Sequence, residues 1–268
     1  MEAIYDRKKL NKMFNSIELS RLYKGGELNR FFSKFGNIFN PDTLIASGGD
    51  TTVFRYEQNG TKLVAKIVPK NIRFFKHFGK NNSAKDFKKY INRLEPYFLP
   101  VEEILYEDEN VFVYTQQKCS LIESDKINKK VVIDVFRLIQ FMLINDILLT
   151  DLAPHNLGII HKHVVVFDYH GLHRLTRDGA IKREDWWRRL VRNLTRFTCG
   201  LYNPKKRPEY SALMQNCDQN VVKKMESDPD IPPVFTTLVK YLMEERNNGS
   251  LEKICELIEN CIRFIKAH

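Results

Sequence analysis

The sequence predicts an α+β fold with two lobes, a strand-rich first half followed by a mostly helical second half. Five short β-type runs and one helix occupy the region before Cys119, and turn residues such as Asn59-Gly60 separate them. After Cys119, apolar residues recur at the spacing of amphipathic helices. Strands followed by helices are typical of α+β architectures. The apolar content of 43% over 268 residues is sufficient to fill a core.

The first half is expected to contain a helical N-terminal extension over residues 1–42 and a strand-rich lobe over residues 43–118. The strands of this lobe are predicted at Thr43–Ala46, Val53–Tyr56, Lys62–Val68, Val101–Tyr106 and Asn110–Gln116. One helix is predicted to begin at Ser83 and to end before Pro96. The apolar residues of this helix share one face and comprise Phe87, Ile91 and Leu94.

The second half, residues 119–268, is expected to fold as a helical lobe. Its first helix is predicted at Ile127–Asp146, where charged residues interrupt the apolar stretch and exclude a membrane span. A small hairpin follows, with strands at Leu157–Ile160 and Val164–Phe167. Further helices are predicted around residues 184–198, 208–226, 233–246 and 251–266.

The composition favours an anionic partner inside the cell. The chain has 43 basic and 33 acidic residues, which gives a net charge of +10. Such a balance attracts nucleotides, nucleic acids, acidic proteins or membrane surfaces. The five cysteines form no C-x-x-C pair and no signal-like segment opens the sequence, so we expect an intracellular protein of the cytoplasm or nucleus. Richness in Lys, Asn and Ile is typical of AT-rich genomes, including viral ones.

Two features of the first half suggest phosphate binding. Gly48 and Gly49 form a turn of small residues, which would let backbone N–H groups approach phosphates closely. Lys66 lies inside the apolar run Leu63–Val68, and a buried lysine is unfavourable unless it meets an anion. The alternatives are an ordinary turn and a lysine on an edge strand whose ammonium reaches solvent.

Two acidic motifs of the second half lie beside apolar runs. Asp151 and Asn156 follow Ile147–Leu149, and Asp168 comes directly after the predicted strand Val164–Phe167. Carboxylates next to apolar runs require a cation or hydrogen-bond partners. Taken singly, each of these residues has the alternative role of a turn cap.

Taken together, these motifs resemble those of the protein-kinase superfamily. Their order is a glycine-rich turn, V-A-K, D-x-x-x-x-N and F-D-x-x-G, and the likeness covers roughly residues 43–190. The resemblance implies a compact, atypical protein-kinase-like fold with a β-rich N-lobe and a helical C-lobe. It also implies an ATP- and Mg²⁺-dependent phosphotransferase, with a protein Ser/Thr hydroxyl favoured narrowly over a small-molecule acceptor.

The resemblance assigns the nucleotide side of the site to the first half. Gly48 and Gly49 would cover the phosphates, and Val53 and Ala65 would enclose the adenine. Lys66 would hold the α- and β-phosphates.

The resemblance assigns the remaining roles to the hinge and the second half. Gln117 would lie in the hinge that reads the adenine edge. Asp151 would orient or deprotonate the acceptor hydroxyl, and Asn156 and Asp168 would bind Mg²⁺. We expect Lys66 and these three residues to converge on one nucleotide.

The chain also departs from the kinase pattern. Ala46 and Thr51 replace the outer glycines of the loop, and Ala153 stands where many Ser/Thr kinases have a lysine. Only sixteen residues separate Asp168 from Asp185, and no A-P-E motif is present. A shortened activation segment of this kind resembles aminoglycoside phosphotransferases and choline kinases.

The acid that pairs with Lys66 has two candidates. Asp86 has a suitable separation from the lysine, but Ser83 and Asp86 also form a capping box. Glu95 lies later, next to Pro96.

Three alternatives concern function. The first is a pseudokinase, a kinase-shaped binding module that recruits an anionic partner. The second is nucleic-acid binding through basic clusters at residues 66–93 and 174–196, for which a solvated helix face is the ordinary explanation. The third is a zinc site among the histidines of residues 155–173, for which turn and loop positions are the better explanation.

Overall fold

The computed structural model describes residues 41–47, 51–70, 83–109, 111–123, 127–169, 171–174, 183–206, 208–210, 213, 220–244 and 250–268. The chain divides into two compact units between Cys119 and Ser120. The roles assigned to the predicted domains stay predictions. Residues 1–40 of the predicted extension and the Gly48-Gly49 turn lie outside the described residues.

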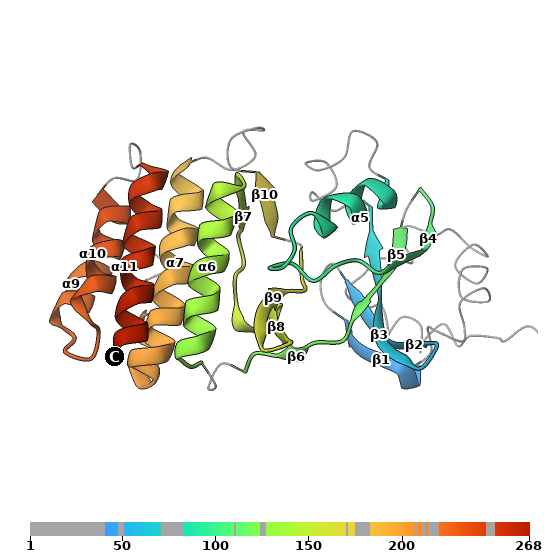
Figure 1. Ribbon diagram of the computed structural model, residues 1–268, viewed down its shortest axis with the longest axis horizontal. Coiled ribbons are helices and arrows are strands. Elements are labelled where there is room, and N and C mark those ends of the chain that lie inside the picture. The colour runs from blue at the N-terminus through green and yellow to red at the C-terminus, as the bar shows by residue number, and fades with distance from the viewer. Residues whose placement is uncertain are drawn as a thin grey trace, which may run out of the picture. The chain divides into compact units, whose positions relative to one another are not determined.

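The first unit contains a five-stranded antiparallel sheet with the order β1-β2-β3-β5-β4 (Figure 1). After the short 3-10 helix η1 (Pro41–Thr43), its strands are β1 (Leu44–Ser47), β2 (Thr52–Gln58), β3 (Thr61–Pro69), β4 (Glu103–Glu107) and β5 (Val111–Gln117). The hairpin predicted at Asn59-Gly60 joins β2 to β3 and is confirmed. Both turn residues have positive φ, 51° and 76°, which is the backbone that an Asn-Gly turn favours.

The helix of the first unit, α5 (Ala84–Asn92), begins where the capping pattern predicts. The side chain of Ser83 accepts a hydrogen bond from the backbone N–H of Asp86. The helix ends at Asn92, before the predicted stop at Pro96, although Leu94 is buried just beyond it. Phe87 packs its ring against Phe112 and Tyr114 of β5, so this helix covers one face of the sheet.

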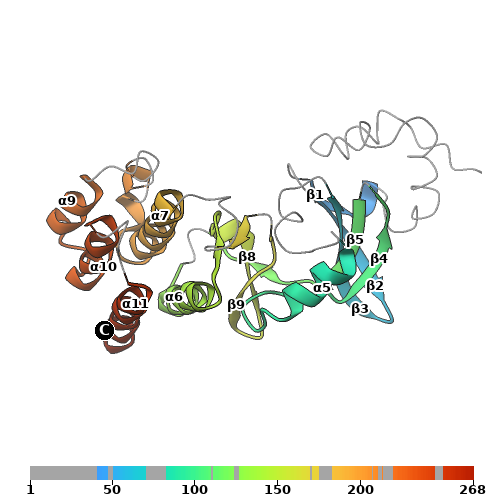
Figure 2. The ribbon, with the colours of Figure 1, turned by 90° about the horizontal axis from the view of Figure 1, so that it is seen from above.

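The second unit is built on a group of helices packed side by side (Figure 2). They are α6 (Lys129–Ile144), α7 (Arg183–Tyr202), α9 (Asn220–Ser227), α10 (Pro233–Glu244) and α11 (Leu251–Ala267), with the short helices η2 (Pro154–Asn156) and η3 (Pro204–Lys206). Phe235 of α10 is central, because its ring lies 6.0, 5.2 and 6.2 Å from the rings of Phe136, Tyr202 and Phe264. Four helices therefore share one aromatic core.

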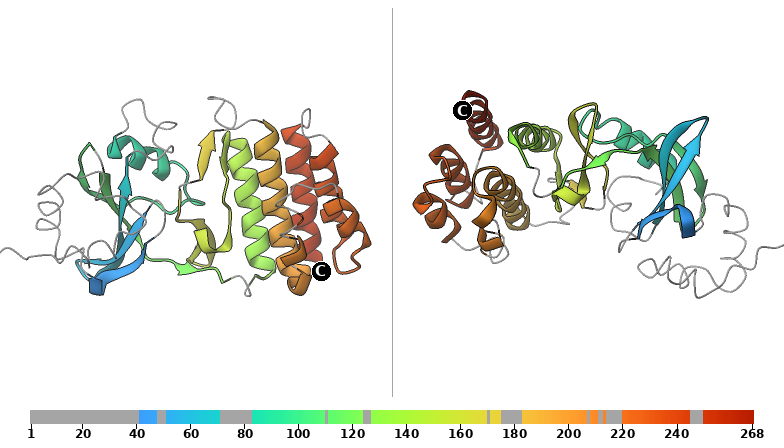
Figure 3. Two further views of the ribbon diagram at one scale, coloured as in Figure 1. Left: turned by 180° about the vertical axis from the view of Figure 1, so that it is seen from behind. Right: turned by 90° about the horizontal axis from the view of Figure 1, so that it is seen from below.

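Two small sheets lie on the α6 side of these helices (Figure 3). The predicted hairpin is confirmed as β8 (Leu157–Ile160) and β9 (His163–Val166), and β6 (Ser120–Leu121) extends it to three strands. A second sheet pairs β7 (Ile147–Leu149) with β10 (Leu172–Arg174). The strands β6, β7 and β10 were not predicted, because two or three residues are too few to show an alternating pattern.

No helix within the described residues combines the length and the apolar character that crossing a membrane requires. The predicted helix over 208–226 is described only in part, as residues 208–210, residue 213 and α9.

Candidate active site

Lys66 lies in the middle of β3 and is buried, with 4% of its surface exposed. Its neighbours across the sheet are Val53 of β2 and Tyr114 of β5, so the three side chains share one face. The ammonium Nζ lies 6.0 Å from the centre of the Tyr114 ring. An aromatic face attracts a cation at this range. Lys66 is therefore an interior lysine of a central strand, and the edge-strand alternative is wrong.

The helix α5 presents apolar side chains to the sheet. Its buried residues are Ala84, Phe87 and Ile91. Asp86, the favoured partner for Lys66, instead accepts a hydrogen bond from Ser83 Oγ at 2.9 Å as part of the helix cap. Glu95 is exposed, beyond the end of the helix. The capping role therefore explains Asp86, and an aromatic surface lies where a pairing carboxylate was expected.

Ala65 and Lys66 lie on opposite faces of the sheet. The resemblance had placed Ala65 beside Val53 at the adenine of the nucleotide that Lys66 would bind, and the strand register does not put Ala65 on the face of those two residues. Adjacent residues of a strand point to opposite faces, and Ala65 pairs instead with Phe54 and with Thr115. The residue that shares the face of Lys66 is Val64, two positions earlier. The alternation of side chains along a strand was the signal that could have identified it.

Gln117 also lies on the face opposite Lys66. It pairs with Leu63 at the end of β5, and its side chain lines a pocket of about 370 Å³ on that face. A hinge contact with adenine would therefore use the backbone of this residue, not its side chain.

Cys119 lies near Lys66, a relation that sequence reasoning missed. Burial raises the pKa of the Cys119 thiol, and the positive charge of Lys66 partly opposes this. The thiol is free and partly buried. It therefore provides a chemical reporter close to the lysine.

In the second unit, Asn156 and Asp168 lie at the same end of the β8–β9 hairpin. Leu157 pairs with Val166 in the last register position, and the N–H of Phe167 donates to the Asn156 carbonyl at 3.4 Å. Asn156 immediately precedes Leu157, and Asp168 lies two residues beyond Val166, directly after Phe167. The hairpin register therefore brings the two predicted metal ligands together.

A glycine contact draws the Asp168 segment alongside Asp151. The N–H of Thr150 donates to the carbonyl of Gly171 at 2.7 Å, where β10 runs beside β7. A Cβ at position 171 would lie 2.7 Å from Thr150 Oγ1 and 3.1 Å from the backbone N of Asp151. The backbone can approach this closely only because residue 171 has no side chain.

Both carboxylate oxygens of Asp151 have polar neighbours. Asn156 Nδ2 donates to Oδ2 at 3.1 Å and to the Asp151 carbonyl at 3.0 Å. Arg196 Nη1 lies 3.9 Å from Oδ1, and the exposed His155 lies 3.9 Å from Oδ2. Asn156 therefore links Asp151 by side-chain hydrogen bonds to the end of the hairpin at which Asp168 follows β9.

Side chains of α7 bind the backbone on either side of Asp151. Three donors come from this helix: Asn193 Nδ2 to the Leu149 carbonyl at 3.4 Å, Arg192 Nη2 to the Thr150 carbonyl at 2.9 Å, and Arg196 Nη1 to the Leu152 carbonyl at 3.2 Å. Buried carbonyls need such partners. Two arginines of the basic cluster 174–196 therefore have an internal role, which narrows the surface available to an anionic partner.

The donor set of Asn156 and Asp168 suits a hard cation. Because the NH₂ group of Asn156 is directed to Asp151, its amide oxygen faces the other way and remains able to accept. Amide and carboxylate oxygens are ligands that Mg²⁺ accepts, and Mg²⁺ keeps several waters. Among the described residues, no group of three or more His, Cys, Asp or Glu side chains could hold a metal.

Comparison with solved structures identifies a fold of the protein-kinase class. The structure of vaccinia related kinase 3 aligns with a TM-score of 0.53, over 84% of this chain and 86% of that chain. The identity is 11%, so the likeness is one of fold alone. No protein-family model matches the chain, and no curated protein matches its sequence. The predicted kinase-like fold is supported, whereas its atypical or viral character stays a prediction.

Proposed function

We propose that this protein is an ATP- and Mg²⁺-dependent phosphotransferase whose acceptor is a protein Ser/Thr hydroxyl. One observation carries the proposal: Asn156, which is hydrogen-bonded to Asp151, lies at the same end of the β8–β9 hairpin as the segment that carries Asp168. A fold of the protein-kinase class supports it, as does the buried lysine of the central strand β3.

In the first unit, Lys66 would bind the α- and β-phosphates of ATP. A phosphate gives a buried ammonium the anion that offsets its desolvation. Val53 and Val64 would contact the adenine, since both lie on the face of Lys66. The backbone of residues 115–119, including Gln117, would read the adenine edge, and Gly48-Gly49 would cover the phosphates.

In the second unit, Asp151 would accept the proton of the acceptor hydroxyl. Its carboxylate is half exposed and accepts a hydrogen bond from Asn156, which suits a base that must meet an incoming group. Asn156 and Asp168 would hold Mg²⁺, which supplies charge neutralisation at the phosphates. Phosphoryl transfer depends mainly on such positioning and electrostatic stabilisation.

The test is transfer of label from γ-labelled ATP. The full chain is incubated with Mg²⁺, with and without casein as a generic protein acceptor. We expect label on the protein or on casein, and a loss of about 100-fold or more in Asp168→Asn. Glu244→Gln, an exposed acid at the end of α10, is the charge-matched control and should transfer like the wild type. Label on an added small-molecule hydroxyl instead of protein would correct the acceptor class.

A second candidate, a pseudokinase, is favoured by one observation. The buried residues of α5 are apolar, and its acid near the expected position, Asp86, is part of the helix cap. A helix whose buried side is apolar is compatible with a binding module. Binding of ATP without any transfer, equally in the wild type and in Asp168→Asn, would decide for this candidate.

A further inference from the structure

The position of Arg196 distinguishes it from the other α7 residues that bind the loop around Asp151. Arg192 and Asn193 each donate to a backbone carbonyl. Arg196 donates to the Leu152 carbonyl at 3.2 Å, and the same Nη1 atom lies 3.9 Å from Asp151 Oδ1. The same guanidinium group therefore lies near both a backbone carbonyl and the carboxylate of the loop.

The environment of Arg196 makes its charge effective. Its side chain is 21% exposed, so solvent screens its charge less than that of a fully exposed arginine. The other oxygen of Asp151, Oδ2, accepts from Asn156 Nδ2 at 3.1 Å. The carboxylate therefore has a polar neighbour at each oxygen, Asn156 of η2 at Oδ2 and Arg196 of α7 at Oδ1. Ala153, which is buried in the same loop, supplies no cation there.

We infer that Arg196 is a positioning residue that orients the Asp151 carboxylate toward the acceptor hydroxyl. The inference rests on the proposed function and extends it by naming the group that aligns the base. A guanidinium suits this role because its planar set of donors can serve two acceptors at once. A lysine has one compact ammonium, which is less suited to contacting the carbonyl and the carboxylate together.

The experiment compares kcat and the KM for ATP in arginine variants of α7, using casein as acceptor. We expect Arg196→Ala to lower kcat about 100-fold while the KM for ATP changes less than about threefold, because a misaligned base affects the reaction step. Arg196→Lys should lose about 10-fold. Arg192→Lys should lose less than Arg196→Lys, because Arg192 serves a single carbonyl. Arg188→Ala, exposed on the same helix, is the charge control.

Added guanidinium separates local positioning from a general effect on folding. We expect millimolar guanidinium to raise the kcat of Arg196→Ala at least about fivefold and to leave Arg188→Ala unaffected. Thermal unfolding of each variant shows whether it is folded. If Arg196→Ala does not fold, the kinetic comparison uses Arg196→Lys in its place.

The possible failures are distinguishable. A wild type that transfers no label refutes the proposed function, and the inference fails with it. A transferring wild type whose Arg196→Ala variant keeps kcat within about twofold refutes the inference alone. Equal losses in Arg192→Lys and Arg196→Lys, without guanidinium rescue, would also refute it, because both arginines would then be backbone anchors only.

Discussion

Gly171 is a residue at which two loops of the candidate site approach each other closely. Replacing it with alanine would place a Cβ 2.7 Å from Thr150 Oγ1 and 3.2 Å from the Thr150 backbone N. We expect Gly171→Ala to lower the free energy of unfolding by about 1–3 kcal/mol, because an extra methyl group must displace packed atoms. Urea denaturation measures this change.

The double variant Thr150→Ala/Gly171→Ala tests the cause. Removing Oγ1 relieves the shortest contact but not those with the backbone, so we expect a partial recovery of stability. Gly60→Ala is a control for backbone strain alone, since Gly60 has φ 76° and open space around it. If Gly171→Ala had the same free energy of unfolding as the wild type, the prediction would be wrong, because the two loops could then move apart at no cost in stability.

Lys66 shows how one residue depends on its surroundings. Its charge is buried, its ammonium lies near the Tyr114 ring, and it opposes the effect of burial on the Cys119 thiol. Tyr114 belongs to β5, and Cys119 follows this strand. The residue type was readable from the sequence, whereas this environment depends on the pairing of β3 with β5.

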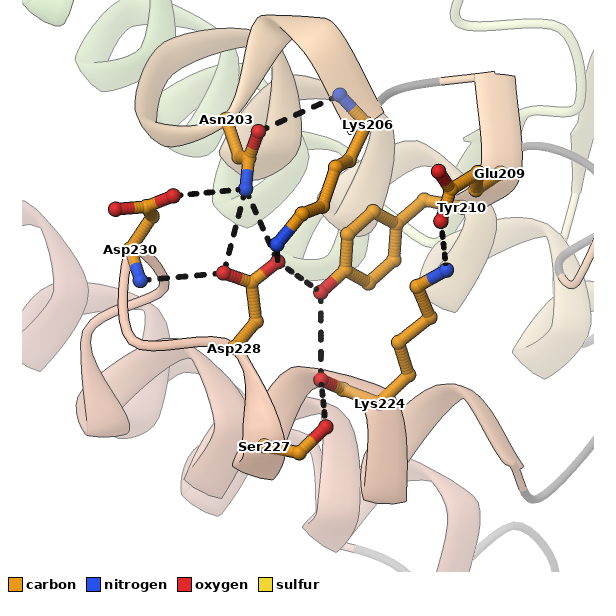
Figure 4. A network of polar contacts seen from close by, with 8 residues as sticks. All are labelled: Asn203, Lys206, Glu209, Tyr210, Lys224, Ser227, Asp228 and Asp230. Atoms are coloured by element: carbon orange, nitrogen blue, oxygen red, sulfur yellow. Dashed lines mark hydrogen bonds and ion pairs between the residues drawn. The ribbon is translucent and has the colours of Figure 1, made fainter.

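At the scale of elements, a polar network joins the end of α7 to the turn between α9 and α10 (Figure 4). Its centre is Asp228, which is 5% exposed. Asn203 Nδ2, Tyr210 Oη and Lys206 Nζ donate to its carboxylate at 3.1, 3.0 and 3.3 Å. A buried carboxylate with several donors fixes the relative position of the elements that carry them.

Acid should weaken this network. Burial alone would raise the pKa of Asp228, but hydrogen bonds from Asp230, Tyr210 and Lys206 and the charge of Lys206 bring it below 3.8, its ordinary value. A lowered pKa in the folded state contributes stability that is complete above pH 3.8. That contribution is lost as the pH falls through the folded-state pKa.

We therefore predict that Asp228→Asn lowers the free energy of unfolding by about 2–4 kcal/mol at pH 7. The difference from the wild type should shrink as the pH falls below 3.8, because the wild-type carboxylate then takes up a proton. Urea denaturation at a series of pH values measures it. Glu226→Gln, an exposed acid of α9, is the control. A difference that stays constant down to pH 2 would contradict the prediction.

At the scale of the whole molecule, Cys119 can report whether both units act on one nucleotide. We predict that ATP with Mg²⁺ slows alkylation of Cys119 by maleimide about 10-fold or more, because a bound nucleotide shields its site. Asp168→Asn, a change in the second unit, should weaken this protection of a first-unit thiol. Mass spectrometry resolves the labelled peptides.

Cys255 of α11 is the internal reference for this measurement. Burial raises the pKa of its thiol as it does for Cys119, so both thiols react slowly at neutral pH. We expect no effect of nucleotide at Cys255. Equal protection of both thiols would indicate a general stabilisation of the protein. If Asp168→Asn left the protection of Cys119 unchanged, Asp168 would not contribute to the nucleotide site that Cys119 reports.

Much of the second-unit site was predictable, because its residues are close in sequence. Asn156 and Asp168 flank a hairpin whose turn and apolar strands are visible in the sequence, and antiparallel pairing must bring its two ends together. Lys66 was also predictable as a strand residue. Its convergence with the second-unit residues on one nucleotide stays a prediction.

Other features required the tertiary structure. The apolar run around Lys66 did not reveal that Ala65 faces away from it until the strand register was known. From the sequence, Asp86 could either cap the helix with Ser83 or pair with Lys66. The structure shows the hydrogen bond between Ser83 and Asp86 that belongs to the cap.

The sequence by itself determined the short-range features of this protein: the hairpins, the helix starts, and the acidic residues at strand ends. These depend on neighbouring residues and on the periodicity of side chains. Only the tertiary structure decided what surrounds Asp151, because Arg192 and Arg196 lie 42 and 44 residues beyond the carbonyls they bind. Which side of a helix meets a distant loop depends on packing of the whole unit, and no local pattern encodes it.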